Sequence, residues 1–245
     1  MRVLLLVLLA LATVAPASAG APRRSGLVVW PARATLVAGS STTLHLANHT
    51  RTSISVAVRT MGLALDLGGA PRLVRSSAGT SLVSVRTVRV VVPPGAVGSV
   101  GVHVSAGRGL APGDRPALVL LTARSAGGAG IGVRVRIGVP VEVRVPGVVR
   151  RRLELGALHV RGRRLELVVR NSGNVAERLG RGSVVVEVWR GSRRLASLQP
   201  RTRDLFPRAR GLVEYRVPTQ LHGRARLIAR VTVPTTGRRA FSIAL

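Results

Sequence analysis

The stretch IGVRVRIGVPVEVRV, residues 131–145, decides the fold class. Apolar residues alternate in it with glycine, proline or charged residues, and a period of two is that of a β-strand with one buried face. The same alternation returns in segments along most of the chain, for example at residues 41–48 and 164–171. The sequence therefore predicts an all-β protein with almost no helix.

The alternating segments are separated by turn residues and fall into two sets of seven. The first set covers residues 27–37, 41–48, 53–61, 82–92, 99–105, 117–124 and 131–145. The second covers residues 153–160, 164–171, 184–190, 194–198, 211–217, 224–233 and 239–245. Seven short strands in about 100 residues are typical of an immunoglobulin-like sandwich. We expect two tandem immunoglobulin-like β-sandwich domains, residues 20–148 and 149–245, with the boundary just after Pro146-Gly147.

Two local features refine this expectation. Pro31 interrupts the first strand, and a proline inside a strand pattern indicates an edge or a switch between sheets. Residues 68–79 are rich in Gly, Pro and Ser and are expected to form a loop without a strand.

The first residues predict export. Arg2 is followed by an apolar run at residues 3–14 and by Ala17-Ser18-Ala19, the pattern of a secretory signal peptide with a small-residue cleavage site. We expect residues 1–19 to be removed and the mature protein to lie in the periplasm or at the cell surface. The chain has no Cys, which excludes a disulfide framework and thiolate metal sites.

The net charge is +29, and every one of the 38 basic residues is Arg. Residues 20–148 hold 15 Arg and 3 acidic residues, and residues 149–245 hold 22 Arg and 6, so the charge is spread over both halves. Nucleic acid is an unlikely partner, because single-strand binders stack bases on aromatic platforms. Aromatic residues make up 2% of this chain and are scattered, as core or interface anchors would be. An anionic wall polymer or membrane surface remains a candidate partner.

No motif predicts catalysis, a cofactor or a metal site. His45 and His49 have helical zinc spacing, but they lie on an expected strand and its exit, where that spacing separates side chains by roughly 13 Å. Nucleophile elbow, phosphate loop and metalloprotease motifs are absent from the sequence. We expect a non-enzymatic protein without cofactors.

Three segments resemble the periplasmic pilus-assembly chaperones. Residues 32–39 (ARATLVAG) and 43–48 (TLHLAN) are similar to the opening of those proteins, and residues 110–115 (LAPGDR) to the stretch before their strand F. The glycine-rich loop and the alternating Ile131, Val133, Val135 and Ile137 fall where their F–G loop and donor strand lie. Wall-associated immunoglobulin-like domains of bacterial surface proteins look similar at this level.

This resemblance implies that the chain binds an exported protein partner by edge-strand complementation. Ile131, Val133, Val135 and Ile137 would fill the groove of the partner, and Arg33, with Arg134 or Arg136, would anchor its terminal carboxylate. The residues alone predict that Asp114 and Arg115 fix the turn into the next strand, with the Asp114 side chain bonded to local backbone. By register the second anchor falls nearer Val139 than an Arg, and Pro140 interrupts the donor strand.

Two alternatives stay open at this level. Residues 131–145 also suit an internal strand whose apolar face packs in its own core, with Arg134, Arg136 and Arg144 solvated. A basic cell-wall or surface module that holds anionic polymers is the alternative function, and it differs from strand complementation in its strong dependence on salt.

Overall fold

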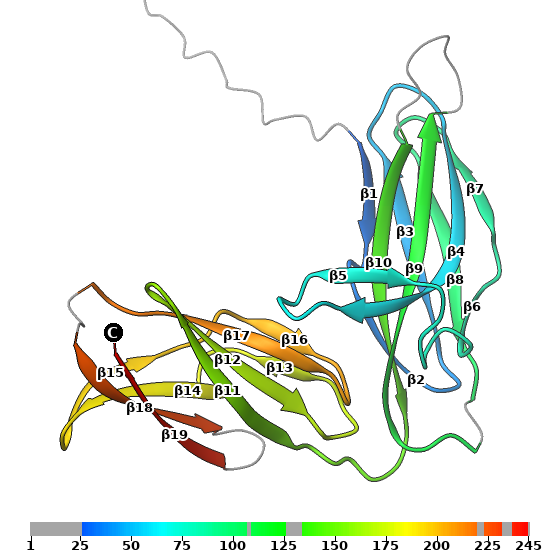
Figure 1. The fold of residues 1–245 in the computed structure, drawn as a ribbon. Coiled ribbons are helices and arrows are strands. Elements are labelled where there is room, and N and C mark those ends of the chain that lie inside the picture. The colour runs from blue at the N-terminus through cyan, green and yellow to red at the C-terminus, as the bar shows by residue number, and fades with distance from the viewer. Residues whose placement is uncertain (1–25, 107–108, 126–133, 220–222, 232–236, 245) are drawn as a thin grey trace, which may run out of the picture.

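The computed structural model describes residues 26–106, 109–125, 134–219, 223–231 and 237–244. These residues form nineteen strands and no helix, so the described part of the chain has no helix that is long and apolar enough to cross a membrane. The strands make two sandwiches arranged as an L (Figure 1). The predicted all-β fold with tandem immunoglobulin-like sandwiches is confirmed. The predicted signal peptide, residues 1–19, lies outside the described residues.

The first sandwich has two sheets, in the orders β1-β3-β8-β6 and β2-β10-β9-β4-β5, with β7 paired to β4. Its strands are β1 (Leu27–Trp30), β2 (Ala34–Val37), β3 (Ser41–Asn48), β4 (Ile54–Leu65), β5 (Pro71–Val74), β6 (Val83–Val85), β7 (Arg89–Val92), β8 (Val97–Val104), β9 (Gly113–Ser125) and β10 (Arg134–Val145).

The second sandwich has sheets in the orders β11-β12-β17 and β15-β14-β18-β19, and β13 pairs with β16 at its side. Its strands are β11 (Leu153–Arg161), β12 (Arg164–Asn171), β13 (Glu177–Leu179), β14 (Val184–Arg190), β15 (Arg193–Leu198), β16 (Arg203–Leu205), β17 (Arg210–Arg216), β18 (Arg224–Val231) and β19 (Gly237–Ala244).

Prolines and polar breaks divide strands that the sequence predicts as continuous. Pro31 ends β1, and β2 continues in the opposite sheet, as the proline predicts. The expected single strand at residues 82–92 is wrong, because β6 and β7 belong to opposite sheets and Arg86 to Val88 connect them. The expectation that residues 68–79 hold no strand is also wrong. Pro71 opens the edge strand β5, where a missing N–H costs no ladder hydrogen bond.

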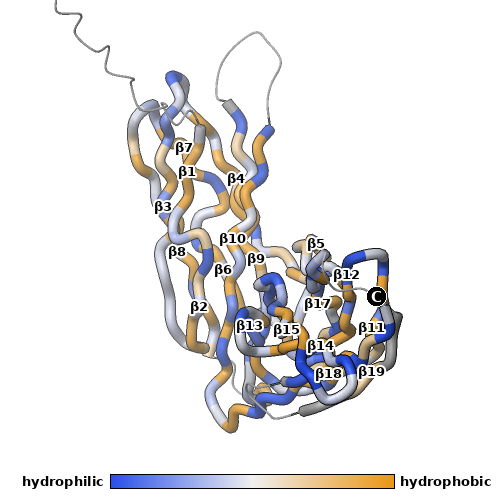
Figure 2. The backbone as a smooth tube through the Cα atoms, turned by 90° about the vertical axis from the view of Figure 1, so that its left-hand side faces the viewer, coloured by the Kyte–Doolittle hydropathy of each residue, from blue (hydrophilic) through white to orange (hydrophobic). Residues whose placement is uncertain are grey.

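Each sandwich buries its own apolar cluster, and the alternation that predicts the strands is visible along the chain (Figure 2). In the first, residues such as Leu44, Val56 and Leu121 are removed from solvent, and in the second Leu167 and Tyr215 are. A third cluster joins Leu63, Leu118 and Leu120 of the first sandwich to Phe206 of the second. The boundary that the sequence predicts near residue 148 lies in the connection between β10 and β11, and it stays a prediction because the two units share this cluster.

In each sandwich a buried asparagine at the end of a strand donates hydrogen bonds to backbone carbonyl groups. Asn48 at the end of β3 donates from Nδ2 to the carbonyl oxygens of Thr52, Val92 and Pro93, at 2.9, 2.9 and 3.1 Å. Asn171 at the end of β12 donates from Nδ2 to the carbonyls of Val175 and Leu205, at 2.8 and 3.1 Å. Both side chains are fully buried. Each amide therefore satisfies backbone groups that a turn would otherwise leave unpaired in the interior.

We expect Asn48→Ala to lower the free energy of unfolding by about 2 to 4 kcal/mol, because the carbonyl of Val92 loses its partner inside the protein. His49→Ala, a change at the exposed neighbouring side chain, should alter stability by less than about 0.5 kcal/mol. Chemical denaturation of both variants measures the difference. Equal stability of the two variants would show that the Asn48 hydrogen bonds contribute nothing net.

Candidate functional site

Half of strand β10 has an unpaired edge. β10 is hydrogen-bonded to β9 along its whole length, from Arg134 opposite Arg124 to Val145 opposite Gly113. On its other side β2 covers only the stretch from Val141, opposite Ala34, to Arg144, opposite Val37. Within the described residues, no strand pairs with the outer edge of residues 134–140. We call these seven residues the open edge.

The backbone of the open edge presents alternate residues outward. In an antiparallel pair the N–H and C=O of one residue point to the same neighbouring strand, and the next residue points the other way. The carbonyl of Arg144 accepts from the N–H of Ala38 on the β2 side, at 2.9 Å. Residues at even positions therefore face the outer edge, which gives Arg134, Arg136 and Gly138 backbone groups that point away from β9. Pro140 lacks an N–H and stands on the same side, where no β9 bond is lost.

The side chains of β10 leave the core gradually toward the open edge. Val139, Val141, Val143 and Val145 are buried in the first sandwich. Ile137 is partly buried against the same core, and Val135 is 44% exposed. The interpretation of the strand as a core strand thus holds for its second half, and its first half carries the same apolar face beyond the core. Ile131 and Val133, the other predicted partner-binding residues, lie outside the described residues.

Strand β1 borders the same open side of the sandwich. β1 is the edge of its own sheet, where it pairs only with β3, and the chain leaves it to become β2, the neighbour of β10. Leu27 and Val29 of β1 pack against the core that Ile137 also contacts. Trp30 is 42% exposed and stacks on His45, with ring centroids 5.4 Å apart, so it is not the core anchor that the sequence suggests.

Arg33 lies where the open edge ends. It precedes Ala34, whose partner is Val141, so it stands level with Pro140. Its guanidinium donates to the carboxylate of Asp204 in β16 of the second sandwich, and this hydrogen bond is the main cause that raises the pKa of Arg33. The side chains of Arg33 and Asp204 are 45% and 27% exposed. The first predicted anchor is therefore at the junction of the two sandwiches and already holds a carboxylate.

Arg134 and Arg136 lie elsewhere. Both are exposed at the start of β10, and Arg136 is four residues from the level of Arg33, roughly 13 Å along a strand. The structure does not bring either of them to Arg33. The acidic Glu142 is instead the charged residue of β10 that acts on Arg33.

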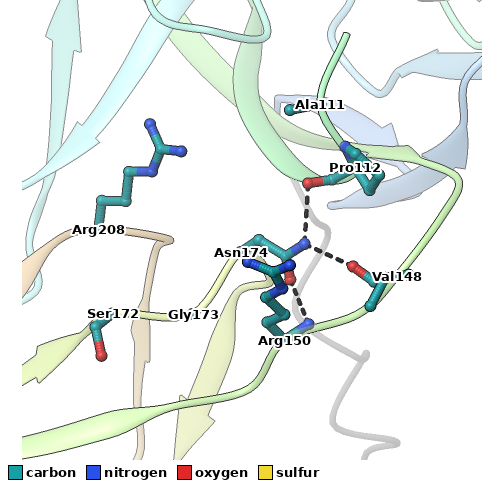
Figure 3. A pocket seen from close by; sticks show the side chains of 8 residues that line it. All are labelled: Ala111, Pro112, Val148, Arg150, Ser172, Gly173, Asn174 and Arg208. Atoms are coloured by element: carbon teal, nitrogen blue, oxygen red, sulfur yellow. Dashed lines mark hydrogen bonds between the residues drawn. The ribbon is translucent and has the colours of Figure 1, made fainter.

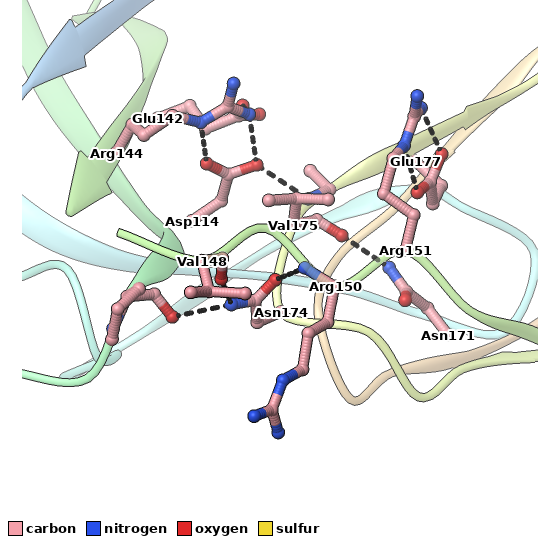
Figure 4. Close-up of polar contacts among 12 residues, drawn as sticks. Asp114, Glu142, Arg144, Val148, Arg150, Arg151, Asn171, Asn174, Val175 and Glu177 are labelled. Carbon is pink, nitrogen blue, oxygen red and sulfur yellow. Dashed lines mark hydrogen bonds and ion pairs between the residues drawn. The ribbon is translucent and has the colours of Figure 1, made fainter. Parts of the chain in front are cut away.

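A buried carboxylate holds the two sandwiches together (Figure 4). Arg144 donates to both oxygens of Asp114, at 2.6 and 2.8 Å, and the N–H of Ala176 in the second sandwich donates to Asp114 Oδ2 at 2.7 Å. The Asp114 side chain has no exposed surface. Asp114 lies inside β9 and does not bond its local backbone, contrary to the sequence-based expectation, whereas Arg115 does donate to the nearby carbonyl of Ala111 at 2.9 Å.

Asn174 makes a second bridge across the junction. Its Nδ2 donates to the carbonyls of Pro112 and Val148, at 3.0 and 2.8 Å, and its Oδ1 accepts from the N–H of Arg150 at 2.7 Å (Figure 3). The backbone comes so close here that a Cβ on Gly113, which has φ of 133°, would lie 2.1 Å from the carbonyl oxygen of Asn174. Beside this bridge is a hollow of about 460 Å³ lined by residues that include Arg150 and Arg208.

The hairpin of β4 and β5 crosses to the second sandwich (Figure 1). At its tip the carbonyl of Leu67 accepts from the N–H of Leu212 and from Nη1 of Arg203, both at 2.7 Å. Burial in this contact lowers the pKa of Arg203. With the shared apolar cluster, these bonds fix the position of Arg33 and the open edge relative to the second sandwich.

Three residues of this site escape prediction from the sequence. Asp204 and Arg203 lie between expected strands, in a segment without apolar alternation, and Asn174 appears only as a turn former. The sequence signal that could have found one of them is the rarity of aspartate, since Asp204 is one of three aspartates in an Arg-rich chain. Among the described residues no group of three His, Asp or Glu side chains is placed to hold a metal ion.

Similarity to known proteins is confined to structure. No protein-family model and no curated protein sequence matches the chain. A chaperone–tip adhesin complex of CFA/I fimbriae contains a similar chain, with 11% identity, a TM-score of 0.53, and coverage of 89% of this chain and 98% of that one. The Class 5 fimbriae chaperone CfaA is similar at 11% identity and TM-score 0.51, over 90% and 100% of the two chains. The complex of the Salmonella enterica SafA pilin with the SafB chaperone contains a chain similar at 13% identity and TM-score 0.50, over 92% of this chain and 99% of that one.

These similarities establish the fold. The chain has the two-domain fold of the periplasmic chaperones of pili, over nearly the full length of both chains. The predicted resemblance to the pilus-assembly chaperones is confirmed at the level of the fold.

We expect Asp114→Ala to lower the free energy of unfolding by about 2 to 4 kcal/mol, because it breaks a buried ion pair and leaves the N–H of Ala176 without an acceptor. The two sandwiches should then unfold in separate transitions, which denaturation followed by two probes detects. Glu154→Ala removes an exposed ion pair with Arg152 and should cost less than about 1 kcal/mol. A single transition at unchanged stability in Asp114→Ala would contradict this role.

Glu142→Gln should raise the melting temperature at about pH 7. Burial, together with the nearby charge of Asp114, raises the pKa of Glu142 above its ordinary 4.5. The folded state thus binds this proton more tightly than the unfolded chain, so the protonated group favours folding below pH 4.5 and that contribution is lost as the pH rises through the folded-state pKa. Thermal melts against pH should show the advantage of the variant shrinking on acidification. An advantage that is independent of pH would point to packing instead.

Proposed function

We propose that this protein is a non-enzymatic chaperone of exported proteins, acts outside the cytoplasm after export, and holds its partner by adding a partner strand to β10. The observation that carries the proposal is the open edge, residues 134–140, which ends at Arg33. Edge-strand addition needs unpaired backbone groups in register and side chains of one kind at alternate positions, and the open edge offers both. The solved structures that share this fold include a chaperone in complex with a pilin.

The direction of the partner strand follows from the position of Arg33. A strand on the open edge lies in line with β2, which runs parallel to β10. If its terminal carboxylate reaches Arg33, its last residue lies just short of Pro140, the level at which Arg33 itself stands, and the strand runs parallel to β10. Backbone groups of Arg134, Arg136 and Gly138 then pair with it, and its apolar side chains lie between β10 and β1, beside Val135 and Ile137.

The charge of the protein supports this arrangement less specifically. Exposed Arg residues occur on both sandwiches, so the charge attracts anionic proteins and polymers alike. Strand addition relies on backbone hydrogen bonds and apolar contacts, which tolerate salt, whereas binding of a polyanion weakens steeply as salt rises.

Hydrogen exchange of the isolated protein tests the open edge directly. The amides of Arg136 and Gly138 should exchange fast, while those of Val139, Val141 and Val143, which lie on the same strand and belong to the buried core, should exchange slowly. A partner that adds a strand should slow exchange at Arg136 and Gly138. Slow exchange at these amides in the isolated protein would mean that the edge is already paired, and the proposal would fail.

Val135→Asp should weaken binding of a synthetic peptide of alternating serine and valine residues, with a free carboxylate, by about tenfold, because a charge would be buried beside the added strand. Val91→Asp is the matched control, since it places the same charge at another exposed valine of the same sandwich. Isothermal titration at low and moderate salt measures both. Equal affinity of the two variants, with binding that vanishes at moderate salt, would favour the polyanion-binding function.

A further inference from the structure

The anchor of the proposed site is occupied by a residue of the protein itself. Arg33 lies in the connection between β1 and β2, and its guanidinium donates to the carboxylate of Asp204 in β16 of the other sandwich. Both side chains are partly exposed, so the pair is accessible from solvent. Arg134 and Arg136, also at the open edge, form no ion pair within the described residues. Of these three arginines, Arg33, at the end of the open edge, is the one that the described structure pairs with a carboxylate.

We propose that Asp204 is a specificity-determining residue, which holds Arg33 until a partner offers a strand and a terminal carboxylate together. This inference rests on the proposed function, because it takes Arg33 as the anchor for the partner. Asp204 then stands in the free protein for the carboxylate that the partner brings.

The reason is competition within one molecule. A free anion that approaches Arg33 must displace Asp204, which the fold of the second sandwich holds at the site through the pairing of β16 with β13. A partner strand paired with the open edge brings its carboxylate to Arg33 at a high effective concentration. That carboxylate can therefore compete with Asp204 for the Arg33 guanidinium. In a protein of net charge +29, which attracts every anion, this contact restricts the anchor to partners that also add a strand.

Asp204 can give way to the partner carboxylate at Arg33 because other hydrogen bonds hold the two sandwiches together. Asp114 with Ala176, Asn174 with Pro112, and Arg203 with Leu67 connect the sandwiches independently of Arg33. Loss of the Arg33–Asp204 pair on binding therefore frees the anchor without separating the domains.

Asp204→Asn tests the inference with the peptide of alternating serine and valine residues, made with a free carboxylate and with a C-terminal amide. We expect the variant to bind the carboxylate peptide about two- to fivefold more tightly than the wild type does, the range that a partly exposed ion pair accounts for. Binding of the amide peptide should not change. Acetate should compete with the carboxylate peptide at a lower concentration in the variant.

Glu214→Gln is the matched control, since it changes the net charge by the same amount on the neighbouring sheet and Glu214 does not contact Arg33. It should leave both affinities unchanged, and Asp204→Ser should reproduce the effect of Asp204→Asn. Suppose that the wild type prefers the carboxylate peptide, but that Asp204→Asn binds neither peptide more tightly or both more tightly by the same factor. That result overturns the role of Asp204 and leaves the proposed function intact. Absence of binding by either peptide, without protection of the open edge, overturns both.

Discussion

The passage of the chain from one sheet to the other at residues 31–33 is the constraint on which the site depends. Because β1 and β2 lie in opposite sheets, β2 can cover only the second half of β10. A single uninterrupted strand would cover one sheet edge fully and leave the other bare. The switch instead leaves two half edges on one side of the sandwich, and it places Arg33 at the point where they meet.

Polar side chains at the junction complete this arrangement by fixing the second sandwich. Asp114 and Asn174 each bond backbone groups on the far side of the junction, and the hairpin of β4 and β5 adds a contact at a distance from them. A hydrogen-bonded polar group in the interior costs more to disturb than an apolar contact, because its partner would be left unpaired. The position of Asp204 beside Arg33 is therefore a property of the whole junction.

The sequence predicts the local elements well and the contacts between them poorly. The period of two in residues 131–145 indicates a strand because it depends on neighbouring residues only, and Pro31 marks the sheet switch for the same reason. Residues 82–92 alternate just as regularly, yet they divide between two sheets, since alternation does not reveal which sheet a strand joins. Asp204 lies 171 residues from Arg33, and charge alone among 38 Arg residues does not identify its partner. Arg134 and Arg136 fit the anchor role by residue type, and only the register of β10 against β2 separates them from Arg33.

The outward Arg residues of the open edge also bear on self-association. An unpaired edge with apolar side chains on one face is a template on which a second copy of the chain can pair, the first step of edge-to-edge aggregation. Two copies paired through β10 would bring the guanidinium groups of Arg134 and Arg136 from both chains close together, with no acidic residue on residues 134–141 to balance them. Electrostatic repulsion between identical copies then disfavours the dimer, while a partner without these charges meets no such barrier. Arg134 and Arg136 thus disfavour self-association and leave the open edge available to a partner strand.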